Sequence, residues 1–104
     1  MDEQTTRLVR QTRQLVSVFR SYGINEWAEW LDRDADLIEA GNLEAGIEHL
    51  LSAYGGMGSM SDVFISRQAG DSIDDKDTSR VNSEVRALRS SIYELAITIK
   101  ARKE

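Results

Sequence analysis

Carboxylates dominate the residues that could carry chemistry, and the densest set is Asp32, Asp34 and Asp36. On a helix these side chains spread over roughly 200°, so they cannot close on one metal ion. The later "DSIDDKD" stretch lacks the glycine and the terminal glutamate of a calcium-binding loop. His49 is the only histidine, with no histidine partner for a metal and no nucleophile near it in the sequence, so we expect a surface histidine. The sequence therefore predicts no metal, no cofactor and no catalytic residues.

Asp34 differs from the neighbouring acids because it falls inside the apolar arc of its helix. At helical spacing it lies between the side of Trp27 and Trp30 and that of Ile38. A carboxylate there is costly unless it is paired. It is either a structural acid bonded to an arginine, a tryptophan N–H or a tyrosine hydroxyl, or a functional acid with a raised pKa. The sequence favours the structural interpretation.

The stretch "AYGGMGSMSD", residues 53–62, holds three of the seven glycines. It lacks the Gly-Lys-Ser/Thr ending of a nucleotide-binding loop, and no strand precedes it. We expect a helix end, a reversal and a helix cap, with Met57 and Met60 filling the core beneath. The alternative is a nest of backbone N–H groups that holds an anion. Both interpretations involve the same residues: Gly55, Gly56, Gly58, Ser59 and Asp62.

Apolar residues recur at helical spacing along the whole chain, which predicts a single all-α domain over residues 1–104. The last helix carries apolar residues in a heptad seam, which suits an antiparallel bundle or a short dimeric coiled coil. We favour the bundle, because the other helices need the apolar face of the last helix to cover their own apolar faces. The expected helices are four main ones at about 3–22, 25–40, 43–54 and 79–102, and a short one at about 60–68.

The net charge of −5 argues against nucleic acid as a partner, which requires cations. No apolar run approaches the ~20 residues of a membrane span. The absence of cysteine fits a cytoplasmic location. The chain is basic at both ends and acidic in the middle. Two explanations, which can both hold, fit this distribution: basic terminal helices pack beside an acidic central one, and an acidic face is offered to a basic partner. That face would comprise Glu29, Asp32, Asp36 and Glu39.

Tyr93 and Ile97 lie away from the heptad seam, on the basic side of the last helix beside Arg86 and Lys100. This apolar strip is either covered by residues 57–65 or left open for a partner or a second copy of the chain.

The stretch "LLSAYGGMGSMSDVFI" resembles a family of short bacterial proteins of unknown function. These share an acidic helix with tryptophans, a "GGMGS" turn followed by a polar residue and Asp, and a long closing helix. Met60-Ser61 departs from the family pattern of an apolar residue followed by Asn. The resemblance implies no catalytic residues. The size and acidity of the family are similar to those of toxin-neutralising proteins. The resembling residues are Trp27, Trp30, Leu50, Leu51, Tyr54 through Ser59, and Asp62.

Together these patterns predict a non-catalytic protein-binding module. Its most concrete form is an immunity-like protein whose acidic face masks a basic toxin or enzyme. The alternatives are a structural homodimer or scaffold assembled through the last helix, and a small-anion sensor at the glycine-rich turn.

Overall fold

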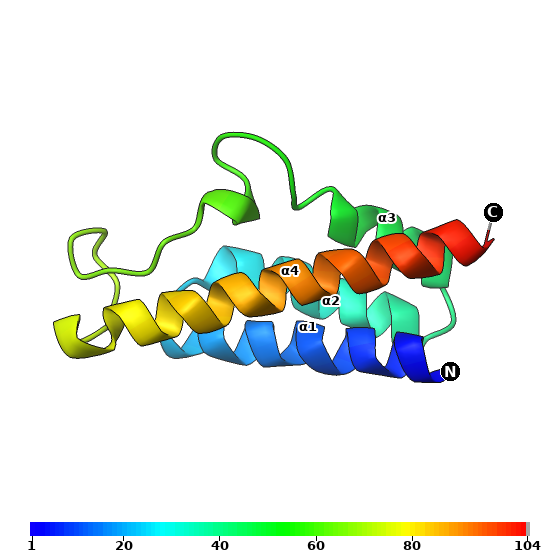
Figure 1. Ribbon diagram of the computed structural model, residues 1–104, viewed down its shortest axis with the longest axis horizontal. Coiled ribbons are helices and arrows are strands. Elements are labelled where there is room, and N and C mark those ends of the chain that lie inside the picture. The colour runs from blue at the N-terminus through cyan, green and yellow to red at the C-terminus, as the bar shows by residue number, and fades with distance from the viewer. Residues whose placement is uncertain (104) are drawn as a thin grey trace.

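The computed structural model describes residues 1–103 and confirms the predicted all-α bundle. The longest helix, α4, runs the length of the molecule beside α1, and both termini lie at the same end (Figure 1). The molecule measures 43 × 24 × 20 Å. In the described part of the chain the elements are α1 (Glu3–Ser21), α2 (Asn25–Glu39), α3 (Leu43–Leu51), the 3-10 turns η1 (Met60–Asp62) and η2 (Asp75–Asp77), and α4 (Thr78–Lys103).

The helices meet through the apolar faces that their spacing predicts. α1 contributes Phe19 and α2 contributes Leu31, both fully buried. α3 lies very close to α2 because Gly46 has no side chain. A Cβ added there would lie 2.6 Å from Cγ1 of Ile38 and 3.2 Å from the carbonyl oxygen of Asp34. The glycine therefore fixes how closely α2 and α3 approach.

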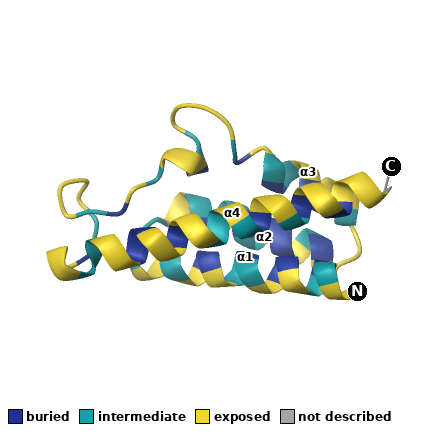
Figure 2. Ribbon diagram, viewed as in Figure 1, coloured by how far each residue is buried: buried dark blue, intermediate teal, exposed yellow. Residues whose placement is uncertain are grey.

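The heptad seam of α4 is covered by the other helices of the same chain. Val81, Val85, Ile92 and Ile99 are all buried along it. Buried residues follow the inner side of α4 and exposed ones its outer side (Figure 2). The bundle thus accounts for the seam.

The predicted helix over residues 60–68 is wrong. Only the short turn η1 forms, and residues 63–66 are without helix. Phe64 is exposed and Ile65 is buried, the alternation of an extended chain. The side chain of Asn82 on α4 accepts from the Ile65 N–H at 2.8 Å and donates to the Ile65 carbonyl at 2.8 Å. These two bonds satisfy the backbone of Ile65 in place of a helix.

The predicted role of the two methionines is half wrong. Met60 is fully buried, but Met57 is 99% exposed. Met57 lies at the tip of the reversal, between glycines that turn the chain away from the core. The third helix also ends earlier than predicted, at Leu51, and Tyr54 lies beyond it.

Candidate functional site

Two places bring together side chains that could bind or react. One is the interface of α2 and α3, around Asp34. The other is a groove between the end of α3 and the outer face of α4.

Asp34 is 0% exposed, and its Oδ1 bonds to Nδ1 of His49 on α3. The ring of Trp30 stacks on that of His49, with centroids 4.2 Å apart and planes 17° apart. The Trp30 indole N–H donates to the His49 carbonyl at 3.1 Å. The partner of Asp34 is thus a histidine, and the expected surface histidine is instead a half-buried residue that links two helices.

Burial raises the pKa of Asp34 to about 6, against the hydrogen bond and the charge of His49 and the charge of Arg33. Its Oδ2 is buried and has no hydrogen-bond partner among residues 1–103. A histidine held by a carboxylate at Nδ1 is half of a nucleophile-activating arrangement. The nearby Ser52 hydroxyl, however, donates to the His49 carbonyl at 2.6 Å and not to the ring. The pair therefore joins α2 to α3 without a bonded nucleophile in the described residues.

Sequence reasoning missed this pair because its members are separated by 15 residues and by a loop. The available signal was a single acid on the apolar arc of one helix and the only histidine on the next. Gly46, one turn before His49, was a second signal, because it permits the close approach of the two helices.

The predicted acidic face meets α1. Arg13 bonds to Asp32 at 2.5 Å, to Asp36 at 3.0 Å and to Glu39. Asp32 also contacts Arg20 at 3.3 Å. Within residues 1–103, Glu29, the fourth acid of the face, makes no ion pair. The structure thus has the first of the two predicted arrangements: a basic terminal helix beside an acidic one.

The glycine turn is an internally bonded reversal. Gly55, Gly56 and Gly58 have φ of 104°, 91° and 81°, a region that only glycine enters easily. The Gly58 N–H donates to Oδ2 of Asp62 at 2.7 Å. The Ser59 hydroxyl donates to the Gly56 carbonyl at 2.7 Å and accepts from the Ser61 N–H at 3.3 Å. The five turn residues come together, but Asp62 occupies a donor that an anion would need.

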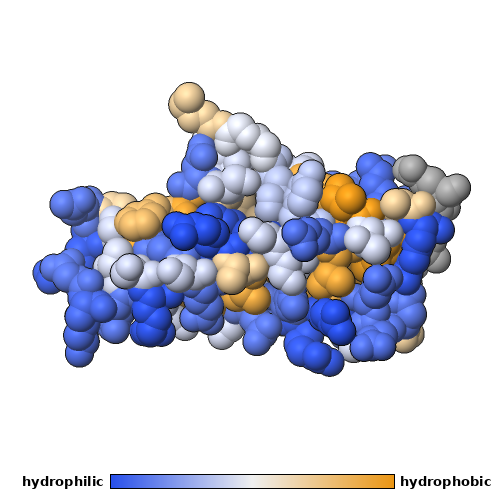
Figure 3. Space-filling model, viewed as in Figure 1, coloured by the Kyte–Doolittle hydropathy of each residue, from blue (hydrophilic) through white to orange (hydrophobic). Residues whose placement is uncertain are grey.

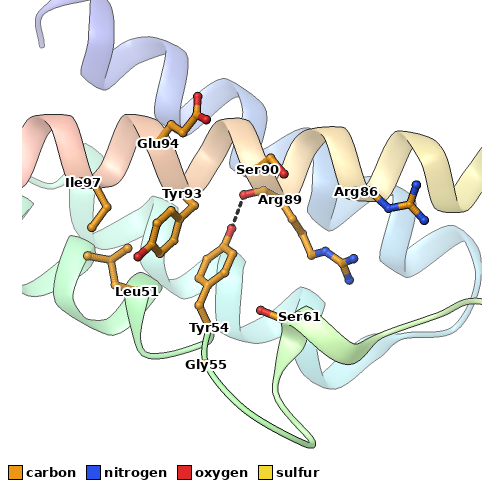
Figure 4. Close-up of a pocket in the computed structure, with 10 residues that line it drawn as sticks. All are labelled: Leu51, Tyr54, Gly55, Ser61, Arg86, Arg89, Ser90, Tyr93, Glu94 and Ile97. Atoms are coloured by element: carbon orange, nitrogen blue, oxygen red, sulfur yellow. Dashed lines mark hydrogen bonds between the residues drawn. The ribbon is translucent and has the colours of Figure 1, made fainter.

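The groove between α3 and α4 has a volume of about 660 Å³ and is open to solvent. At one end Tyr93 and Ile97 of α4 lie opposite Leu51, and Tyr54 lies beside them (Figure 4). The Tyr54 and Tyr93 rings meet edge to face with centroids 5.1 Å apart, and the Tyr54 hydroxyl donates to the Arg89 carbonyl at 2.8 Å. Tyr93 is 43% exposed and Ile97 40% exposed. The strip of Tyr93 and Ile97 was predicted to be either covered or left open, and in the structure it is open.

Arg86 and Arg89 line the other end of the groove (Figure 4). Nη1 of Arg89 donates to the carbonyls of Met60 and Val63, each at 3.0 Å, and so holds the loop against α4. Burial lowers the pKa of Arg89, and the like charge of Arg86 lowers it further. Neither arginine forms an ion pair with a carboxylate of residues 1–103. Sequence reasoning placed Arg86 beside the strip but missed Arg89, because the loop that Arg89 holds was predicted to be helical.

Among residues 1–103, no three His, Cys, Asp or Glu side chains lie close enough together to hold a metal ion. In the same range no helix combines the length and the hydropathy needed to cross a bilayer.

The chain was compared with known families, curated proteins and solved structures. The family model described as a domain of unknown function (DUF6966) matches residues 20–74. The matched span is more than half of the chain and includes α2, α3 and the glycine turn. No curated protein and no solved structure matches the chain.

Proposed function

The chain belongs to the DUF6966 family, and we propose that it is a non-catalytic protein-binding module whose partner docks in the groove between α3 and α4. The observation that carries the proposal is the exposed strip of Tyr93 and Ile97, which the other residues that the structure describes leave partly uncovered. In Figure 3 hydrophobic residues gather over the C-terminal half of α4 and the adjoining α3.

The composition of the groove supports this proposal. Tyrosine and arginine are enriched among the residues that contribute most to protein interfaces, and Lys and Glu are depleted. The groove presents Tyr54, Tyr93, Arg86 and Arg89. One wall of the groove is α4, and the other is formed by the end of α3 and the loop that follows it, which Arg89 holds against α4.

The acidic face is a second surface through which such a module could bind a partner. The immunity-like form, in which Glu29, Asp32, Asp36 and Glu39 mask a basic toxin, remains part of the proposal as the alternative. Exposed ion pairs contribute little stability, so a basic partner could compete with Arg13 for these acids. We favour the groove because Arg86 forms no ion pair within residues 1–103 and because Tyr93 and Ile97 remain exposed.

The homodimer and the anion sensor are also proposals. A homodimer built through α4 would use the same strip of Tyr93 and Ile97. An anion at the glycine turn would have to displace Asp62 from Gly58. A bacterial origin and a cytoplasmic location complete the proposal, supported by the sequence resemblance and by the absence of cysteine.

A site-specific photocrosslinker distinguishes the surfaces. Tyr93→p-benzoylphenylalanine places the crosslinker in the groove, and Asp36→p-benzoylphenylalanine places it on the acidic face as the matched control. We expect a crosslinked partner protein in the native cell from position 93 and none from position 36. Crosslinking only from position 36 would support the acidic face instead. A crosslink from position 93 only to a second copy of the chain would support the homodimer.

A further inference from the structure

The groove has two chemically different ends along one face of α4. Arg86, Arg89, Tyr93 and Ile97 follow one another at intervals of three or four residues, so their side chains share one face. At a rise of about 1.5 Å per residue, Arg86 and Tyr93 are separated by roughly 10 Å along the helix axis. A ligand that uses both ends must therefore separate its two recognition groups by about this length.

The two arginines of the basic end form no ion pair with a carboxylate of residues 1–103. Arg13, Arg20 and Arg102 all pair with carboxylates, whereas Arg86 forms no ion pair within residues 1–103. Arg89 uses its guanidinium on two backbone carbonyls, which are neutral acceptors. Two like charges thus line the same groove. Burial is the main cause of the lowered pKa of Arg89, and the charge of Arg86 adds to it. A carboxylate bound at this end would supply the countercharge that Arg86 lacks within residues 1–103.

Two acids lie near the groove, and neither forms an ion pair with Arg86 or Arg89. Asp62 acts on Arg89 at longer range, while its Oδ2 accepts from the Gly58 N–H. Glu94 projects toward the far edge of α4 in Figure 4, away from Arg86. Within residues 1–103 no carboxylate forms an ion pair with Arg86 or Arg89, so a carboxylate of another molecule can pair with them.

The apolar end fits a single side chain. Tyr93 and Ile97 remain two-fifths exposed, and Leu51 faces them across the groove (Figure 4). An aliphatic or aromatic group placed there would remove apolar surface on three residues from water, which stabilises a complex by about 25 cal/mol per Å² before the costs of association.

From this arrangement we infer that the groove binds an acidic peptide segment of the partner protein, with a carboxylate at Arg86 and Arg89 and an apolar side chain at Tyr93, Ile97 and Leu51. The inference rests on the proposed function and names the partner chemistry. A separation of ~10 Å corresponds to about three residues in an extended peptide. In a helical peptide it corresponds to about seven residues. The segment therefore carries Asp or Glu at one of these distances from its apolar residue.

Selection from a library of random 12-residue peptides displayed on phage, against the whole folded chain, tests the inference. We expect enriched peptides to carry an acid three or seven positions from a leucine or an aromatic residue. A synthetic copy of the best peptide should bind at least tenfold more weakly to Arg86→Glu and to Tyr93→Ala. Arg10→Glu, which makes the same change in net charge on exposed α1 surface, should alter its affinity less than twofold.

A charge swap provides the rescue. The same peptide with its acid replaced by Lys should bind poorly to the original chain and regain affinity for Arg86→Glu. Circular dichroism of each variant establishes that the helices are retained. Arg86 is the residue to change because Arg89 also anchors the loop, so that its substitution would affect the fold.

The outcomes separate the two proposals. Peptides that depend on Tyr93 but are neutral or basic, or are indifferent to Arg86→Glu, would overturn the acidic-peptide inference and leave groove binding in place. If no peptide depends on Tyr93, or none is enriched, both the inference and the proposed groove function are overturned.

Discussion

The two faces of α2 place the same residue type in opposite environments. On the outer face, Asp32, Asp36 and Glu39 meet Arg13 in contact with water. On the inner face, Asp34 meets His49 with none of its surface exposed. Water already solvates the outer charges, so pairing them adds little. The inner carboxylate has lost its water, so its one partner matters much more. The comparison teaches that the number of polar contacts on a helix face is a poor guide to how much that face contributes to stability.

Removing His49 should produce the largest effect. His49→Ala leaves Asp34 buried without its partner, and leaving a buried polar group without a partner costs about 3 kcal/mol. We expect the free energy of unfolding at pH 7, measured by urea denaturation, to fall by this amount. As a control, Asp34→Leu combined with His49→Leu removes both members and should recover most of the loss. A loss below about 1 kcal/mol for His49→Ala would show that the two faces are equivalent.

The pH dependence of stability sharpens the same contrast. The pKa of Asp34 is about 6 in the folded protein, above its ordinary value of 3.8. The folded state therefore binds the proton more tightly than the unfolded state between these values. The contribution of Asp34 to the free energy of unfolding is complete below about pH 4 and is lost as the pH rises through 6, by as much as about 3 kcal/mol.

This contribution is measured as the difference in unfolding free energy between the original chain and Asp34→Asn across pH 4 to 7. As the pH rises, the original chain should become less stable relative to Asp34→Asn. Asp36→Asn serves as the control on the outer face and should show a much flatter difference. A stability difference for Asp34→Asn that does not change with pH would contradict the raised pKa.

The close approach of α2 and α3 is what holds His49 against Asp34, and Gly46 permits it. Gly46→Ala introduces a Cβ 2.6 Å from Cγ1 of Ile38. We expect a loss of about 2 kcal/mol from the resulting overpacking. Fluorescence of the tryptophans should also change, because Trp30 stacks on His49. Gly41→Ala is not a suitable control, because Gly41 has a φ of 94°. Ser52→Ala, at an exposed position after α3, should cost less than 1 kcal/mol.

The smallest effect is expected on the outer face. Arg13→Ala removes three contacts at once but leaves acids that water can solvate, so we expect a loss of about 1 kcal/mol. The loss should shrink further in 1 M salt, which screens exposed charges. Arg10→Ala, at an exposed position of the same helix, is the control and should be near neutral. A loss from Arg13→Ala larger than that from His49→Ala would reverse the comparison.

Much of the fold could be predicted from the sequence. The apolar spacing predicts four helices, and three of them begin and end within one residue of the observed positions. The burial of Asp34 follows from its place on the apolar arc of α2, because helical periodicity alone determines which face a residue occupies. The loop over residues 60–68 could not be predicted in the same way. Its extended course depends on Asn82, which is 17 residues away from Ile65 in the sequence.

The sequence by itself determined the helices, the reversal at the glycines and the separation of charge along the chain, because each depends on neighbouring residues. The tertiary structure decided which groups became partners. It brought Arg13 to the acids of α2, His49 to Asp34, and left Arg86, Tyr93 and Ile97 uncovered. The physical reason is that helical periodicity is local, whereas pairing and solvent exposure depend on how closely helices approach. Here that approach is set by a residue without a side chain, Gly46.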